Sequence, residues 1–478
     1  MPRKAVLALL ADGARADVLA RMAAAGELPA IQRYFVDRGG LATATSVFPT
    51  VSGPAHLPLL AGVHPGNANL PGIRWAERPA AGAGRFLGRT RSYMAPMRAW
   101  KLERDVPAMV QTLFTYVPAM ADVNTWFVRG CPARARRTRW SKPVAFLRAL
   151  LTRDWASSGD QTERALLAAL EHGFTSVHAV FPAIDELGHR FGPLSEPSFA
   201  AYRRFDRAVQ RILDALARRQ QADDTLIVIS SDHGQTATHT HVDIDAVVSE
   251  IYPRTVCYPK LWRYCLSAQA AVMVSGNSMA NIYAQGEGGW RQRPDFDAPA
   301  SRAAELKARL LAHPAVEHVI YRGQEVDSYV LANREGLLRM WMGGGGGDAR
   351  IHFSVEGKNP LGYAEVPASA SSYEVARFTA ATEYPDAPWQ IAQFYRSQRA
   401  GDLVVCARHG FDLRARFEYQ PHNGSHGGLH RDHMLVPALA NGRWARDRLR
   451  TVDLFPSILA ALGQPIPPHV DGEVVPIE

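Results

Sequence analysis

Six side chains of the kinds that bind metal ions stand in four short segments, far apart in this 478-residue chain. They are three aspartates and three histidines: Asp12, Asp185, His189, Asp232, His233 and His426. Mixed sets of carboxylate oxygens and imidazole nitrogens are typical of zinc sites in proteins. Because Asp185 and His189 are four residues apart, one helical turn would present both side chains to the same ion. The residue types therefore predict a centre that holds two divalent cations, with zinc as the expected metal.

Each of the four segments is weak evidence when it is taken alone. An aspartate that follows a strand, such as Asp12, is more often a turn or helix-capping residue. A histidine among glycines, such as His426, is more often an ordinary loop residue. The segments gain weight together because each falls where a predicted strand ends, and the glycines beside them allow close backbone approach. We therefore interpret them as parts of one site.

Ser52 is the predicted nucleophile, in the segment of residues 47–62. It directly precedes Gly53 and Pro54, and proline is favoured in the first turn of a helix, so Ser52 is expected to be an N-cap residue. A helix N-terminus offers free N–H groups and positive potential to a phosphoryl group. A serine hydroxyl is a weak nucleophile, and coordination to a cation would remove its proton. The alternatives are a plain helix cap at Ser52 and Thr50 as the nucleophile.

Short apolar runs that alternate with amphipathic segments must position these residues. Predicted strands span residues 5–10, 175–181, 225–229 and 434–438, and predicted helices span residues 16–25, 196–219 and 451–462. This alternation is typical of a parallel sheet covered by helices on both faces. Such sheets place their sites outside the carboxyl ends of the strands, which is where Asp12, Asp185 and Asp232 fall. The predicted fold class is α/β, with a mostly parallel sheet sandwiched between helices.

Two regions break this alternation. Residues 76–160 are rich in arginine, tryptophan and tyrosine, and residues 240–400 mix strands with tryptophans and the glycine run 343–347. That run is not followed by Gly-Lys-Ser/Thr, so it is not a phosphate-binding loop and is predicted to be a loop tip. We expect a core over residues 1–240 and 400–478, an insertion over 76–160 that flanks the site, and an inserted α+β cap over 240–400.

Composition narrows the class of protein further. No apolar run approaches the roughly 18 residues that a membrane span needs, so no transmembrane segment is predicted. The N-terminal apolar run ends at Asp12 without a cleavage site, which favours a cytoplasmic protein.

The formal net charge of +8 comes from an excess of arginine and suits an anionic substrate, although a general preference for arginine explains it as well. Four scattered cysteines are expected to be mostly buried, reduced thiols: Cys131, Cys257, Cys265 and Cys406.

The motifs also match a known pattern when they are taken in chain order. They are Asp12-Gly13, Pro49-Thr-Val-Ser52-Gly-Pro-Ala-His56, Asp185-x-x-Gly-His189-x-x-Gly-Pro193, Ser231-Asp232-His233-Gly234 and Gly424-Ser-His426-Gly. This set, with the tail of residues 451–463 and 471–472, resembles the nucleotide pyrophosphatase/phosphodiesterase branch of the alkaline phosphatase superfamily. The resemblance implies an alkaline-phosphatase-like core. It also implies one zinc held by Asp185, His189 and His426, and another held by Asp12, Asp232 and His233 with Ser52 facing it.

The same resemblance implies a hydrolase of phosphate esters. We expect it to cleave phosphodiester or pyrophosphate bonds through a covalent phosphoseryl intermediate on Ser52. Nucleotide-cleaving members carry an aromatic residue after the nucleophile and an asparagine further along, where Gly53 and Ile73 stand here. Three residues near these positions are candidate substrate contacts: Asn69, Arg74 and Trp75. The expected partner is a small-molecule phosphate ester rather than a specific nucleic acid, and the chain is expected to be a monomer or a homodimer.

Other activities stay open on the same residues. The scaffold would also suit a phosphomonoester or phosphonate hydrolase. Monoesterases of the alkaline phosphatase type, however, carry an acidic ligand shortly before the Asp185 position, and residues 179–182 here are Ala-Val-Phe-Pro. A sulfatase is disfavoured. Ser52-Gly-Pro54 is similar to the start of the sulfatase motif Ser/Cys-x-Pro-x-Arg, but His56 stands at the position of the arginine. Outside catalysis, the chain could be an anion-binding module whose basic run, residues 129–142, docks on nucleic acid or anionic lipid.

Overall fold

The computed structural model describes residues 2–78, 90–94, 100–138, 157–257, 267–344, 348–416, 418 and 422–478. The chain forms two compact units. Unit 1 comprises residues 1–64, 93–237 and 432–478, and unit 2 comprises residues 65–92 and 238–431. The expected division into a core, a flanking insertion and a cap stays a prediction. Cys265, part of the glycine run and the end of the basic run lie outside the described residues.

A mostly parallel sheet forms the centre of unit 1. Its order among the described strands is β21-β2-β20-β7-β1-β6-β5. β1 is central and pairs in parallel with β6 on one side and with β7 on the other, whereas β20 runs antiparallel to β7 and β2. Its strands are β1 (Ala5–Ala11), β2 (Ala42–Thr45), β5 (Met120–Val123), β6 (Ser176–Phe181), β7 (Thr225–Ser230), β20 (Leu435–Ala440) and β21 (Arg448–Arg450).

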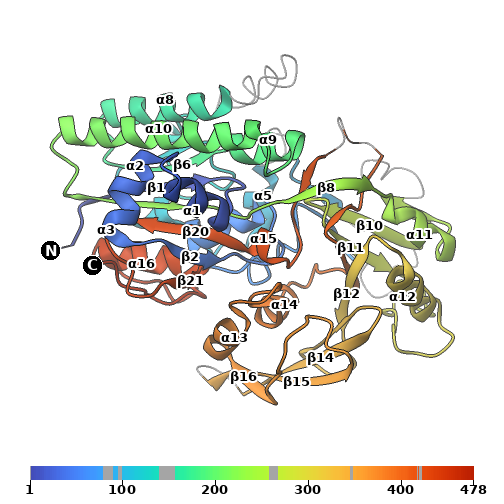
Figure 1. Ribbon diagram of the computed structural model, residues 1–478. Coiled ribbons are helices and arrows are strands. Elements are labelled where there is room, and N and C mark those ends of the chain that lie inside the picture. Colours follow the sequence, from blue (N-terminus) through green and yellow to red (C-terminus); the bar gives the residue numbers. More distant parts are fainter. Residues whose placement is uncertain are drawn as a thin grey trace. The chain divides into compact units, whose positions relative to one another are not determined.

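Helices cover both faces of this sheet (Figure 1). On one face, α1 (Ala16–Ala24), α8 (Ser157–Glu171) and α10 (Glu196–Arg218) share a buried core with alternate residues of the central strands, such as Leu7 and Leu9 of β1. On the other face lies α16 (Leu454–Ala461), which is apolar and largely buried. Because successive side chains of a strand point to opposite faces, β1 is buried along its whole length. The expected sandwich is confirmed.

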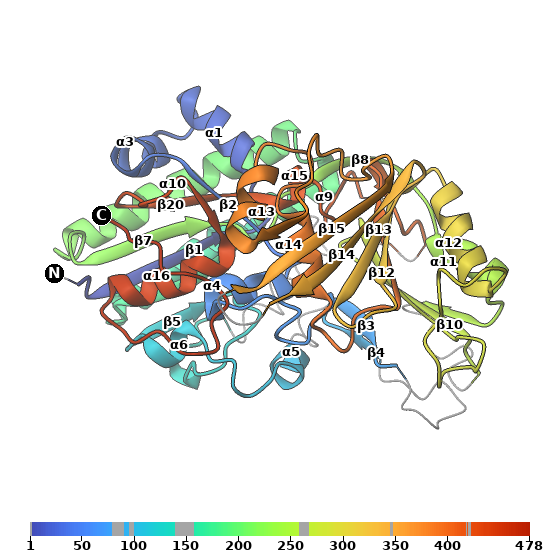
Figure 2. The same ribbon diagram turned by 90° about the horizontal axis from the view of Figure 1, so that it is seen from below.

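Unit 2 is built on a second, mostly antiparallel sheet. Among the described strands its order is β16-β15-β14-β13-β12-β17-β11-β10-β9, and Figure 2 shows β12 to β15 side by side. The helices α11 (Ile244–Ile251) and α12 (Arg302–Ala312) share one hydrophobic core with β10, β11, β12 and β17. The inner strands are β10 (Ala270–Ser275), β11 (Met279–Ala284), β12 (Val316–Arg322), β13 (Ser328–Ala332), β14 (Gly336–Gly343), β15 (Arg350–Gly357) and β17 (Leu403–Ala407); β9 (Thr255–Cys257) and β16 (Ser369–Ser371) are the edges.

The elements predicted for unit 1 are confirmed. The four predicted strands correspond to β1, β6, β7 and β20, and the predicted helices to α1, α10 and α16, the last preceded by the 3₁₀ turn Thr451–Asp453. Three cysteines within the described ranges are free thiols; Cys131 and Cys406 are buried, and Cys257 is half-buried. Burial raises the pKa of each of these thiols to about 12. In the described part of the chain, every helix is too short or too polar to cross a bilayer.

Candidate metal centre and nucleophile

Three neighbouring strands of unit 1 deliver most of the predicted ligands. β6, β1 and β7 are adjacent and parallel, so their carboxyl ends lie at one edge of the sheet. Asp12 directly follows β1, and Asp232 and His233 come two and three residues after β7. Beyond β6, the chain enters helix α9 (Ala183–Phe191), which carries Asp185 and His189. Sheet topology thus gathers five of the six predicted ligands at one edge of one unit.

Backbone contacts hold two of these segments tightly together. The backbone N–H of Asp185 donates to the carbonyl oxygen of Asp12 at 3.0 Å. Gly13 has a φ of +78°, and a Cβ built there would lie 2.8 Å from the Cα of Asp185. Only glycine permits both this left-handed turn and this approach. The Asp12-Gly13 sequence is therefore what lets the carboxylates of Asp12 and Asp185 converge.

Ser52 lies beside this group and is half-buried. Its hydroxyl oxygen lies 3.1 Å from Nε2 of His233 and 3.4 Å from Oδ1 of Asp12. Nδ1 of His233 faces the carbonyl oxygen of its neighbour Gly234 at 3.2 Å, so the tautomer that satisfies both nitrogens has its proton on Nδ1. Nε2 then presents a lone pair toward the Ser52 hydroxyl.

The expectation that Ser52 caps a helix is wrong. The helix that follows begins as a 3₁₀ turn, Pro54–His56, whose N-cap is Gly53 at a φ of +91°, and continues as the five-residue α4 (Leu57–Ala61). The positive φ of Gly53 turns the chain before the helix starts. The Ser52 side chain therefore faces Asp12 and His233 instead of the helix N–H groups. Two such short helical pieces leave little macrodipole for the nucleophile, since that effect depends on aligned peptide units.

The buried acids strongly influence one another. Burial raises the pKa of Asp12 well above its ordinary value, and the nearby carboxylates of Asp232 and Asp185 raise it further. Burial acts in the same sense on Asp232, but His233 and His56 overcome it and hold the pKa of Asp232 well below its ordinary value. A cluster of enclosed carboxylates with this mutual repulsion is the kind of environment that a cation would stabilise.

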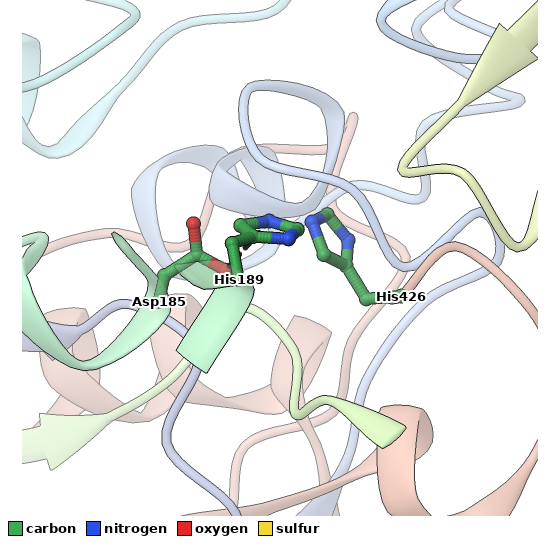
Figure 3. Close-up of side chains that lie close together, drawn as sticks. All are labelled: Asp185, His189 and His426. Atoms are coloured by element: carbon green, nitrogen blue, oxygen red, sulfur yellow. Dashed lines mark ion pairs between the residues drawn. The ribbon is translucent and has the colours of Figure 1, made fainter. Parts of the chain in front are cut away.

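Asp185 and His189 lie one turn apart on α9, as the spacing predicted. Their side chains are partly exposed and form an ion pair, with Nε2 of His189 3.4 Å from Oδ1 of Asp185 (Figure 3). Gln235 fixes the carboxylate of Asp185 from the β7 side. Its amide nitrogen donates to the backbone carbonyl of Asp185 at 3.0 Å and also to Oδ1.

The donor set in unit 1 suits divalent cations. Ligand atoms of Asp12, Asp185 and His233 lie within 4.8 Å of one another, and those of Asp12, His56 and Asp232 form a second such group. Oδ2 of Asp232 is fully buried without a hydrogen bond from any described residue, although Nε2 of His233 is only 3.3 Å away. A cation bound to both groups would stabilise a buried carboxylate oxygen that lacks a hydrogen bond and lies beside an imidazole nitrogen. How the ligands divide between individual ions stays a prediction.

His426 belongs to unit 2. It directly follows β19 (Gly424–Ser425) and is buried. Its backbone N–H donates to the carbonyl of Gly276, and its carbonyl accepts from the N–H of Ser278, both at 3.0 Å. These two bonds fix the residue against the turn between β10 and β11. Its role as a ligand stays a prediction.

The three candidate substrate contacts also lie in unit 2, where each side chain makes internal contacts. Asn69 accepts a hydrogen bond from the hydroxyl of Ser397 at 2.9 Å, and Arg74 donates to the carbonyl of Val274 at 2.9 Å. Trp75 is fully buried, with the guanidinium of Arg399 4.4 Å from its ring centre. Their contact with substrate stays a prediction.

His56 is the site residue that the sequence did not single out as functional. Its ring is fully buried, with Nε2 3.2 Å from Oδ2 of Asp232. In the sequence it is one histidine between apolar residues, the pattern of a core side chain. The available signal was its place at the end of the motif Pro49-Thr-Val-Ser52-Gly-Pro-Ala-His56, which carries the family resemblance.

Comparisons with known proteins identify the family and the fold of this chain. Residues 6–429 match the family described as type I phosphodiesterase / nucleotide pyrophosphatase. Murine ectonucleotide pyrophosphatase/phosphodiesterase 5 has a similar structure, with a TM-score of 0.58, 15% identity and 98% of each chain covered. Phosphonoacetate hydrolase from Sinorhizobium meliloti, solved with phosphonoacetate, is similar with a TM-score of 0.55, 18% identity and 96% of each chain covered. No curated protein sequence matches this chain.

Proposed function

This chain belongs to the type I phosphodiesterase/nucleotide pyrophosphatase family, and from that premise we propose that it hydrolyses phosphodiester or pyrophosphate bonds with Ser52 as nucleophile and two bound divalent cations. One observation carries the proposal. The Ser52 hydroxyl lies between His233 and Asp12, at 3.1 and 3.4 Å, at the edge where the strand-end carboxylates converge. A purely structural serine would not need a buried carboxylate and an imidazole nitrogen beside its hydroxyl.

The protein's own residues supply position and orientation. Asp12 accepts a hydrogen bond from the Ser52 hydroxyl, and Nε2 of His233 lies 3.1 Å from the same oxygen, so the two residues hold this oxygen toward the site. That oxygen attacks phosphorus, the ester oxygen of the leaving group departs, and water then hydrolyses the phosphoserine. When bound, the cations supply Lewis-acid stabilisation of the charge on the phosphoryl oxygens and the leaving group. The fixed geometry lowers the entropic part of the barrier.

We assign the ligands as the motifs suggest. Asp12, Asp232 and His233 hold one cation beside Ser52, and Asp185 and His189 hold the other, with His426 as its third ligand. Zinc suits these nitrogen and oxygen donors. Supporting the second set, Asp185 and His189 lie one helical turn apart, with Nε2 of His189 3.4 Å from Oδ1 of Asp185. The cytoplasmic location and the monomeric or dimeric state stay predictions from the sequence.

The preference for diesters rests on what precedes α9. Residues 179–182 are Ala-Val-Phe-Pro, and Ala179, Val180 and Phe181 are buried in β6. The chain therefore has no carboxylate there for a third cation. The structural neighbour solved with phosphonoacetate makes phosphonates the second candidate class.

The contacts of Arg129 in the basic run argue against a pure anion-binding role. Its guanidinium group donates hydrogen bonds to the carbonyls of Glu103, Val106, Pro107 and Val110, so these hydrogens are used inside the fold.

The decisive experiment compares four substrates on zinc-loaded protein: an aryl phosphate diester, the matching monoester, a phosphonate and a sulfate. We expect the diester to have the highest kcat/KM of the four substrates in the wild-type protein. The Ser52→Ala variant should lose this activity toward the diester. Faster turnover of the phosphonate would move the function to the second candidate class. Preferred turnover of the sulfate, or full diester activity in Ser52→Ala, would overturn the proposal.

A further inference from the structure

His56 is a buried histidine to which the proposed reaction gives no part. It ends the 3₁₀ turn Pro54–His56 and is completely enclosed. Nε2 of its ring lies 3.2 Å from Oδ2 of Asp232. The ring also packs edge-on against Trp126, with the ring centres 6.3 Å apart. A polar ring in this position, beside a buried acid, requires an explanation.

The two carboxylate oxygens of Asp232 have different surroundings. Oδ1 accepts a hydrogen bond at 3.4 Å from the backbone N–H of Gly13. Oδ2 lies between two imidazoles, 3.2 Å from Nε2 of His56 and 3.3 Å from Nε2 of His233. If His233 binds a cation, its Nε2 has no proton for Oδ2. His56 is then the neighbour that can donate to this oxygen.

The two imidazoles also differ in the groups that lie beside their ring nitrogens. His233 turns Nδ1 toward a carbonyl and Nε2 toward Ser52, which leaves Nε2 as a cation ligand. Nδ1 of His56 is buried without a hydrogen bond from any described residue. A proton on that nitrogen would be a buried donor without an acceptor, so the neutral tautomer with its proton on Nε2 is the least costly. In that tautomer, Nε2 is a donor 3.2 Å from Oδ2 of Asp232, although its N–H is not yet aligned with that oxygen, and it has no lone pair for a metal.

We propose that His56 is a positioning residue that donates its Nε2–H to Oδ2 of Asp232 and fixes this carboxylate in the orientation that binds a cation. The inference rests on the proposed two-metal site. The separation of 3.2 Å is within hydrogen-bond range, and the N–H must turn toward Oδ2 to become aligned with it. Trp126 packs edge-on against one side of the ring. Groups that orient a ligand in this way raise metal affinity about 10–100-fold.

The test measures metal binding directly in wild type, His56→Ala and His56→Gln. Zinc affinity is obtained by competition with a chromogenic chelator, and the ligand environment from the visible spectrum of the cobalt-loaded protein. We expect His56→Ala to bind two cations at saturation, with the affinity of one of them lowered about 10–100-fold. The cobalt spectrum should keep its form because no ligand is lost. His56→Gln, whose amide can donate to Asp232, should recover most of the affinity.

Two results would overturn the inference. Unchanged zinc affinity in His56→Ala would show that Asp232 needs no such support. Loss of one equivalent of cobalt at saturation, with a changed spectrum and no recovery in His56→Gln, would make His56 a ligand itself. His318→Ala is the matched control, because His318 is also fully buried but lies in unit 2 and bonds the carbonyl of Pro360 instead of Asp232. If it weakens zinc binding as much as His56→Ala does, general destabilisation explains the effect and the inference fails.

The same measurements separate this inference from the proposed function. If wild type binds two cations and cleaves the diester while His56→Ala keeps full zinc affinity, only the role of His56 is wrong. If wild type itself binds no cation and cleaves no ester, the proposed function is wrong, and the positioning role fails with it.

Discussion

The Ser52 hydroxyl oxygen lies 3.1 Å from Nε2 of His233, although the two residues are 181 positions apart in the chain. The contact exists because β7 runs parallel to β1 and ends beside it, which carries His233 to the edge where Asp12 also lies. The tautomer set by Gly234 leaves the lone pair of Nε2 on this side. The proposed nucleophile and a proposed cation ligand are therefore in contact before any substrate arrives.

The first prediction concerns the covalent step at Ser52. Acid quenching during turnover of a labelled diester should trap label on Ser52 in wild type. Ser52→Ala should trap none and lose at least about a thousandfold in kcat, as when a nucleophile is removed from other hydrolases. Ser52→Thr keeps the hydroxyl and is the matched control, with activity within about tenfold of wild type. Label recovered from Ser52→Ala at another residue, Thr50 above all, would contradict the assignment.

The second prediction concerns Gln235, whose amide holds both the backbone carbonyl and Oδ1 of Asp185. Gln235→Ala releases the carboxylate, so zinc affinity should fall about 10–100-fold, while kcat at saturating zinc changes much less. Gln235→Glu has nearly the same shape but places a carboxylate against Asp185, so its affinity should fall further. Equal zinc affinity in wild type and both variants, measured by chelator competition, would show that Asp185 needs no such support.

Much of this site could be predicted from the sequence, for a reason that belongs to the fold. Buried parallel strands read as apolar runs, and their carboxyl ends share one edge, so Asp12, Asp185 and Asp232 had to meet. The pair Asp185 and His189 follows from helical spacing alone. These predictions needed only local patterns and one topological rule.

The rest depended on contacts that local patterns do not encode. The φ of Gly53 turns Ser52 away from the helix cap, and a sequence shows only that glycine allows such a turn. His56 reads as a core residue until Asp232 is placed beside it. The sheet of unit 2 pairs β12 with β17 and β11 with β17, strands far apart in the chain, so periodicity predicts the strands but not their order.

The third prediction concerns removal of the cations. Chelation should lower the melting temperature, because Asp12, Asp185 and Asp232 then repel one another, and added zinc should restore it. A ligand at one hundred times its Kd contributes about 2.7 kcal/mol of stability. Asp12→Asn removes a carboxyl group that costs folding free energy at neutral pH, because burial and the neighbouring acids raise its pKa. Its metal-free form should therefore melt above metal-free wild type, although its zinc-loaded form melts below zinc-loaded wild type. A chelator that leaves the wild-type melting temperature unchanged would contradict a resident metal.

The fourth prediction concerns Gly53, at the position where related nucleotide-cleaving enzymes carry an aromatic residue. Its φ of +91° is one that side chains rarely adopt, whereas a Cβ there would lie 3.5 Å from the ring of Trp126, an ordinary contact. Backbone strain, and not collision with Trp126, should therefore oppose substitution. Gly53→Ala is expected to lose about 1–3 kcal/mol of unfolding free energy in urea, the usual range for such strain.

The double variant Gly53→Ala/Trp126→Ala tells these two causes apart. If strain dominates, Gly53→Ala costs the same free energy of unfolding with or without Trp126, because removal of the indole leaves the φ unchanged. If the penalty disappears in the Trp126→Ala background, the indole is the obstacle. An aromatic side chain could then follow Ser52 once Trp126 is removed. Equal penalties in both backgrounds would mean that the backbone turn at Gly53 excludes an aromatic residue there. Any aromatic surface that stacks on a substrate beside Ser52 must then come from another segment. Trp126 is the candidate, because its ring is the nearest to Gly53.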